Sequence, residues 1–104
     1  MICSKEVTTK LKVKNICGTH MLTRNDGKLL HNVILTHWET SKSIEIDFAN
    51  ATIASVSFLD EAIGQLIIQF PRKDIASKLK LVRISQFDKK LLNDIAATRF
   101  RQIT

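Results

Sequence analysis

The most constraining feature of the chain is the stretch from residue 43 to residue 71, because its apolar pattern changes period there. Ile44, Ile46 and Phe48 alternate with acidic residues, which predicts a strand with one buried face. After residue 57 the apolar positions recur at helical spacing, at Phe58, Leu59, Ala62, Ile63, Leu66, Ile67 and Phe70. Pro71 ends this pattern, since a proline disfavours helical geometry at the residue before it. The stretch therefore predicts a strand followed by an amphipathic helix over 58–70.

The same patterns predict the other elements. Strands are expected over 8–16, 43–48 and 79–84, and helices over 24–38, 58–70 and 86–100, with residues 19–22 as loop or short strand. This order predicts an α/β two-layer sandwich with a mixed sheet of about three to five strands. The first two strands alternate instead of being apolar throughout, so we expect the helices mainly on one face. The open face would then carry Lys10, Lys12, Lys14, Glu45 and Asp47.

Each predicted helix is preceded by the same start signal. The signals are Thr23-x-x-Asp26, Ser57-x-x-Asp60 and Ser85-x-x-Asp88, in which the hydroxyl caps free amides and the acid lies near the positive helix end. Two glycines lie within the helices. Gly27 falls on the apolar stripe of the first helix, where we expect it to let helix and sheet approach closely. Gly64 lies in the middle of the second helix, which indicates close packing there.

Composition narrows the class of protein. At 104 residues, with 44% hydrophobic and 25% charged residues, we expect one globular domain spanning 1–104. No apolar run approaches the ~20 residues that span a bilayer, and no signal peptide is evident. Two cysteines without an export signal favour reduced thiols and a cytoplasmic location. Cys17 and His20 have no second Cys/His cluster to complete a zinc site, so we predict no metal and no cofactor.

The sequence does not predict an enzyme. His31 and His37 are six residues apart and so do not share a helix face at the usual spacing. Asp60 and Glu61 are adjacent, so their side chains should point in different directions. The chain has no glycine-rich phosphate loop, no nucleophile elbow and no HExxH motif. We therefore expect a binding module.

Charge is distributed unevenly along the chain, which bears on nucleic-acid binding. Residues 71–104 hold nine Lys/Arg against three acids, whereas residues 23–70 hold three against six. Lys10, Lys12 and Lys14 form a candidate basic patch, and phosphate contacts alone would give weak, sequence-independent binding. No recognition-helix motif and no tyrosine for base stacking are present. A small domain that binds nucleic acid non-specifically is therefore the alternative to a protein-binding module.

Two motifs in this chain follow a known family pattern. The first is Asp47-Phe48, followed by Ser-Val-Ser-Phe-Leu-Asp-Glu over 55–61 and by Gly64; the second is Thr-Arg-Asn-Asp-Gly over 23–27. With these motifs the chain resembles the STAS-like domain family, relatives of the bacterial anti-anti-sigma factors, over roughly residues 11–100. The resemblance implies the two-layer fold and a role in binding other proteins.

The resemblance also implies a regulatory site. The partners of domains in this family are often ATPases of the histidine-kinase fold, which phosphorylate the serine at the start of the helix. Ser57 takes that place here, while Ser55 and Phe58 replace the family's flanking aspartate and glycine. The expected phospho-acceptor and partner surface therefore comprises Ser55, Ser57, Phe58, Asp60 and Glu61, with Arg24 nearby if the two motifs converge. We expect Arg24 to neighbour Asp47, Asp60 or a phosphate, or else to be exposed without a partner. The oligomeric state stays open.

Overall fold

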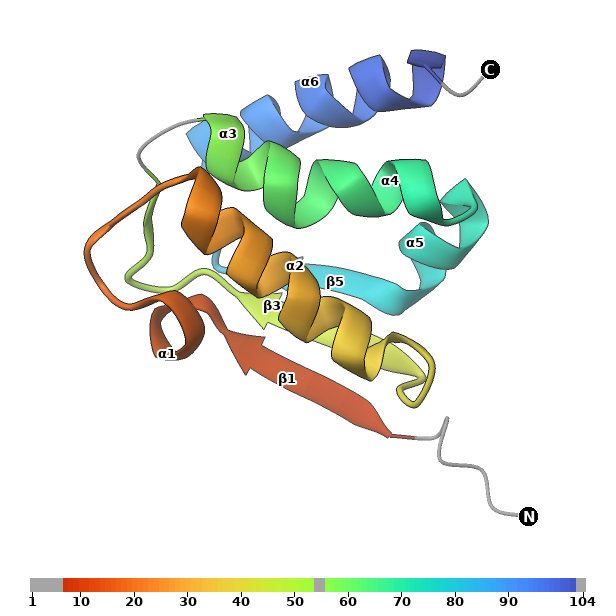
Figure 1. Ribbon diagram of the computed structural model, residues 1–104, viewed down its shortest axis with the longest axis horizontal. Coiled ribbons are helices and arrows are strands. Elements are labelled where there is room, and N and C mark those ends of the chain that lie inside the picture. Colours follow the sequence, from red (N-terminus) through yellow and green to blue (C-terminus); the bar gives the residue numbers. More distant parts are fainter. Residues whose placement is uncertain (1–6, 54–55, 103–104) are drawn as a thin grey trace.

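The computed structural model describes residues 7–53 and 56–102. In chain order its elements are β1 (Thr8–Lys12), α1 (Val13–Cys17), β2 (Met21–Leu22), α2 (Arg24–Trp38), β3 (Ser43–Asp47), β4 (Thr52–Ile53), α3 (Val56–Leu59), the π-helical turn η2 (Asp60–Gly64), α4 (Gln65–Gln69), α5 (Arg72–Lys78), β5 (Leu79–Val82) and α6 (Gln86–Gln102) (Figure 1). The segments α3, η2 and α4 run on as one continuous helix, which we call the central helix.

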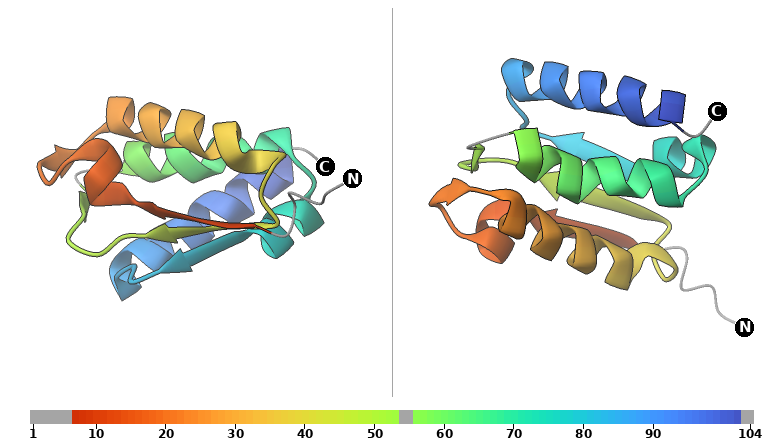
Figure 2. Two further views of the ribbon diagram at one scale, coloured as in Figure 1. Left: turned by 90° about the horizontal axis from the view of Figure 1, so that it is seen from below. Right: turned by 45° about the horizontal axis from the view of Figure 1, so that its top comes forward.

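The strands form two small parallel sheets. The larger has the order β1-β3-β5, and β2 pairs with β4 in the smaller. The predicted α/β fold is confirmed, and the observed pairing is parallel throughout the described residues. Parallel pairing follows because each strand of the larger sheet is joined to the next by a connection that contains helix and returns the chain to the same end. In Figure 2, α2 and the central helix lie on one face of this sheet, and α6 lies beside the central helix, beyond β5.

The core lies between the sheet and these helices. Ile44 and Ile46 of β3 are fully buried and face Leu30 and Ile34 of α2 across it, as the alternating strand and the helical stripe predict. Phe58 is the largest fully buried side chain. Full burial of one such side chain contributes roughly 1.5–3 kcal/mol, so this cluster fixes how the helices lie on the sheet.

Two helical segments differ from the predictions. The predicted strand 8–16 ends at Lys12, and α1 follows it, because Val13 and Cys17 are both buried at a helical spacing that the alternation of Leu11 and Val13 concealed. The short helix α5 was not predicted, since none of its residues is buried and its pattern has no apolar stripe. The bounds of α2 match the prediction of 24–38.

The face of the larger sheet opposite the helices carries charged residues in register. Lys10 of β1 and Lys80 of β5 both lie opposite Glu45 of β3, and Lys12 lies opposite Asp47. These opposite charges alternate across neighbouring strands, as predicted. Lys14 does not continue the row, because it lies in α1. The expected patch of three lysines is therefore reduced to two.

Both helical glycines lie where helices cross closely. A Cβ on Gly27 would lie 2.5 Å from the carbonyl oxygen of Phe58 and 3.0 Å from Cβ of Glu61. The expectation of a helix–sheet approach at Gly27 was wrong, since the close neighbour is the central helix. A Cβ on Gly64 would meet the carboxylate of Asp60 and lie 3.1 Å from Cγ2 of Ile95 in α6. The predicted close packing at Gly64 is confirmed. None of the described helices is long and apolar enough to cross a membrane.

Candidate functional site

The start of α2 is fixed by a local capping interaction. The Thr23 backbone N–H donates to Oδ2 of Asp26 over 2.9 Å, and Nε2 of His20 lies 3.0 Å from the same oxygen. The hydrogen bond from Thr23 and the contact with His20 hold the pKa of Asp26 below its usual value. The capping prediction for α2 is thus confirmed, and it places Arg24 as the first residue of the helix.

Arg24 joins the two predicted motifs in space. Its Nη1 donates to Oε2 of Glu61 over 2.6 Å, and its Nη2 donates to Oγ of Ser57 over 3.1 Å. We call these three residues the Arg24 cluster. The Arg24 side chain is 53% exposed and that of Glu61 is 15% exposed, so the cluster lies at the surface with its carboxylate partly shielded. The close crossing at Gly27 brings the starts of the two helices within reach of each other.

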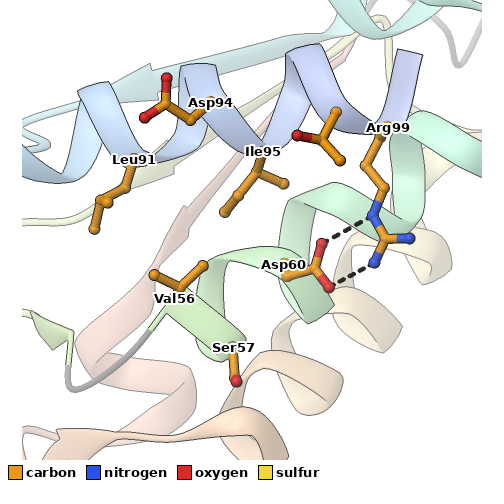
Figure 3. A pocket seen from close by; sticks show the side chains of 8 residues that line it. Val56, Ser57, Asp60, Leu91, Asp94, Ile95 and Arg99 are labelled. Atoms are coloured by element: carbon orange, nitrogen blue, oxygen red, sulfur yellow. Dashed lines mark hydrogen bonds and ion pairs between the residues drawn. The ribbon is translucent and has the colours of Figure 1, made fainter. Parts of the chain in front are cut away.

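The neighbouring acid, Asp60, points to the other side of the central helix. Arg99 of α6 donates to it through Nε over 2.9 Å and through Nη2 over 2.5 Å, a bidentate pair (Figure 3). This pairing raises the pKa of the Arg99 guanidinium. The predicted divergence of Asp60 and Glu61 is confirmed. One carboxylate ties the central helix to α2, and the other ties it to α6.

A groove of about 460 Å³ runs between the first turns of the central helix and α6 (Figure 3). Its apolar lining comes from Val56, Leu91 and Ile95, and its polar lining from Ser57, Asp60, Asp94, Thr98 and Arg99. Val56 is 46% exposed, and Met21 of the nearby smaller sheet is 63% exposed. Apolar surface flanked by polar groups is typical of a site that binds another molecule.

Two of the predicted site residues differ in role or place from the expectation. Ser57 is not the N-cap, because α3 already begins at Val56 and the Ser57 hydroxyl accepts a hydrogen bond from Arg24. Phe58 is fully buried and cannot be part of a partner surface. Its side chain belongs to the apolar stripe and packs into the core. Ser55 lies outside the described residues. The structure thus brings together Ser57, Glu61 and Arg24.

The predicted neighbours Asp47 and Asp60 do not pair with Arg24. Asp47, at the end of β3, accepts from Nε of Arg83 over 2.9 Å, from its Nη2 over 2.7 Å and from the Ala49 N–H over 2.9 Å. These hydrogen bonds, with Arg83 the largest contributor, lower the pKa of Asp47 to about 2. Arg83 was not predicted as a partner. The only sequence signal was its place near the end of the strand predicted over 79–84, at the same sheet edge as Asp47.

The side chains gathered at the site are charged groups and hydrogen-bond donors and acceptors. Within the described ranges, no three His, Cys, Asp or Glu side chains are grouped as metal ligands would be. Ser57 contacts a guanidinium, which donates hydrogen bonds and does not remove a proton. Cys17 is buried, and this burial raises the pKa of its thiol to about 11, so the thiolate nucleophile is disfavoured. An arginine next to a serine is instead suited to binding an anion.

Comparison with known proteins agrees with the motifs and the fold. The family model for the STAS-like domain of unknown function (DUF4325) matches residues 26–89. The chain belongs to this family. The matched part of this STAS-like domain extends from the first turn of α2 to the start of α6 and includes Ser57 and Glu61. Arg24 and β1 lie before the matched residues, although β1 is part of the same sheet. Searches of curated proteins and of solved structures found no match.

Proposed function

We propose that this STAS-like domain is a non-catalytic module that binds another protein through the Arg24 cluster and the groove beside it. The observation that carries the proposal is the contact of Arg24 with both Ser57 and Glu61 at an exposed surface. Exposed Val56 supplies apolar area on the same turn of the central helix. Arginine with an adjacent apolar side chain is a combination enriched at protein–protein interfaces.

The same geometry supports a phospho-switch at Ser57. A phosphate on this hydroxyl would carry a charge of about −1.5 to −2 beside a guanidinium that already contacts the oxygen. Arg24 would then form charge-assisted hydrogen bonds to the phosphate and give up part of its contact with Glu61. The first turn of a helix tolerates this added negative charge. A kinase-like ATPase or an anti-sigma-like protein is the partner class that we propose, in the cytoplasm.

The structure gives less support to the alternative, non-specific nucleic-acid binding, than to protein binding. The alternative was predicted from a row of three lysines and from the excess of basic residues over 71–104, and Lys14 does not lie in that row. Lys10 and Lys12 lie opposite Glu45 and Asp47 on the neighbouring strand, and these carboxylates would repel phosphates. We therefore base the proposed function on the protein-binding surface.

The test uses two apolar side chains at opposite ends of the central helix. Val56 is 46% exposed beside the groove, and Ile68 is 41% exposed near the other end. Each is replaced with glutamate in a tagged protein, which is used to capture partners from the native lysate for quantitative mass spectrometry. We expect Val56→Glu to lose a specific partner that wild type and Ile68→Glu both retain. Equal recovery by both variants, each shown to be folded, would contradict the proposed surface.

A further inference from the structure

The outer edge of β5 is a second feature with no role in the Arg24 cluster. Among the described residues β5 pairs only with β3, so its other edge is unpaired (Figure 2). The N–H of Phe48 donates to the carbonyl of Val82, which places the backbone groups of Val82 toward β3. Because backbone groups alternate in direction along a strand, the N–H and C=O of Leu81 point to the unpaired side. No strand of the described residues pairs with these groups.

An apolar groove lies beside this edge. It has a volume of about 270 Å³ and lies between β5, α5, α6 and the central helix. Its apolar lining includes Ile67, Ile75, Leu79, Leu81, Leu92 and Ala96. Leu79 and Leu81 are only half-buried, although they belong to the strand face that looks toward the core. A strand added next to β5 would direct every second side chain into this groove.

The charges on the face of the sheet away from the helices indicate which charged side chains the added strand would carry. Across the sheet, Lys10, Glu45 and Lys80 lie in register, so the sign of the charge alternates from strand to strand. The next position, beside Lys80, favours an acidic residue. A second copy of β5 in antiparallel pairing would bring its own Lys80 and Arg83 to this edge, and like charges on adjacent strands are destabilising. The alternating charges therefore favour a strand from a different protein over a second copy of β5.

We propose that the β5 edge binds an extended segment of another protein in which apolar and acidic residues alternate. The segment adds as a fourth strand to the sheet, with its apolar side chains in the groove and its acidic side chains beside Lys80. Its main-chain groups bond to Leu81, and its side chains supply specificity, as in other cases of strand addition. This site lies away from the Arg24 cluster and stands independently of the function proposed for that cluster.

The probe is a capped eight-residue peptide that alternates valine and glutamate, titrated into the ¹⁵N-labelled protein. We expect the amide signal of Leu81 to shift and its hydrogen exchange to slow. A peptide with lysine in place of glutamate should bind several-fold more weakly. The variant Lys80→Glu should reverse this preference. Its matched control, Lys10→Glu, changes the other lysine opposite Glu45 and should leave peptide binding unchanged.

Two N-methylated peptides test whether main-chain pairing is involved. One is methylated on its valines and the other on its glutamates, so only one set of methyl groups faces β5. We expect one peptide to lose binding by about tenfold or more, because several hydrogen bonds are removed, and the other to retain it. Equal binding of the two peptides, no response of Leu81 at millimolar peptide, or an unchanged preference in Lys80→Glu would overturn the proposal. Protection of Leu81 in a peptide-free dimer would also overturn it, by making a second copy the occupant.

Discussion

Replacing Gly27 with alanine should destabilise the fold, although alanine is the better helix former. The new methyl group would lie 2.5 Å from the Phe58 carbonyl oxygen, which is backbone and cannot rotate away. It would also lie 3.0 Å from Cβ of Glu61. Forcing a methyl group into a well-packed contact costs about 1–3 kcal/mol, and the rigid backbone neighbour places this contact in the upper part of that range, at about 2–3 kcal/mol. The gain in helix propensity offsets up to about 1 kcal/mol of this.

The net loss expected for Gly27→Ala is therefore about 1–2 kcal/mol, measured by urea denaturation. The matching fall in Tm is about 4–8 °C for each kcal/mol in a domain of this size. The control is Asn25→Ala, an exposed position in the same helical turn, where a change within about 0.5 kcal/mol is expected. Equal or higher stability of Gly27→Ala would refute the reasoning. It would mean that α2 and the central helix separate without cost and that their close crossing does not hold Arg24 in place.

Three further predictions concern other parts of the fold. Gly64→Leu should lower Tm by several degrees in a thermal melt, and Gly64→Ala by much less, because alanine must move only the end of the Asp60 side chain and Cγ2 of Ile95 slightly, whereas leucine must displace α6; higher stability of both variants would contradict the packing. The pKa of Asp47 is lowered from 3.8 to about 2, so its contribution to stability is complete above pH 3.8 and is lost as pH falls toward 2. In Asp47→Asn or Arg83→Gln, the free energy of unfolding, measured by urea titration, should therefore change less with pH over that range. The same pH dependence as in wild type would refute this. Ser85→Ala should cost about 0.5–2 kcal/mol, because Ser85 Oγ accepts the Asp88 N–H at the start of α6. Ser57→Ala should cost less than Ser85→Ala, since the Ser57 hydroxyl accepts a hydrogen bond from an exposed arginine and Ser57 lies inside α3 rather than at its N-cap; the opposite order would contradict these assignments.

How much of the fold follows from the sequence depends on how long each pattern is. The bounds of α2 were predicted because an apolar stripe of four turns and the cap at Thr23 agree. The first strand, predicted over 8–16, was predicted too long because Val13 fits both the alternation before it and the helical spacing to Cys17 after it. A short element such as α5, with no buried face, leaves no pattern to detect.

The candidate site could be predicted only in part. Ser57, Glu61 and Arg24 were named from the motifs, but the contact between residues 24 and 61 depends on how two helices cross, which no local pattern encodes. Phe58 was placed on the surface by the motif, although its place in the apolar stripe indicated the core, and the stripe was correct. Ser57 fits the spacing of a cap, yet α3 already includes Val56, the residue before it.

The most direct test of the central claim adds charge at Ser57 and measures partner binding. Ser57→Asp is compared with Ser77→Asp, a serine on the exposed surface of α5, whose hydroxyl donates to the backbone of Asp74. Both proteins are checked for wild-type stability and used to capture the partner that Val56→Glu loses. We predict that Ser57→Asp recovers several-fold less of that partner, whereas Ser77→Asp recovers as much as wild type. Equal recovery by Ser57→Asp and wild type would contradict control of binding by charge at Ser57.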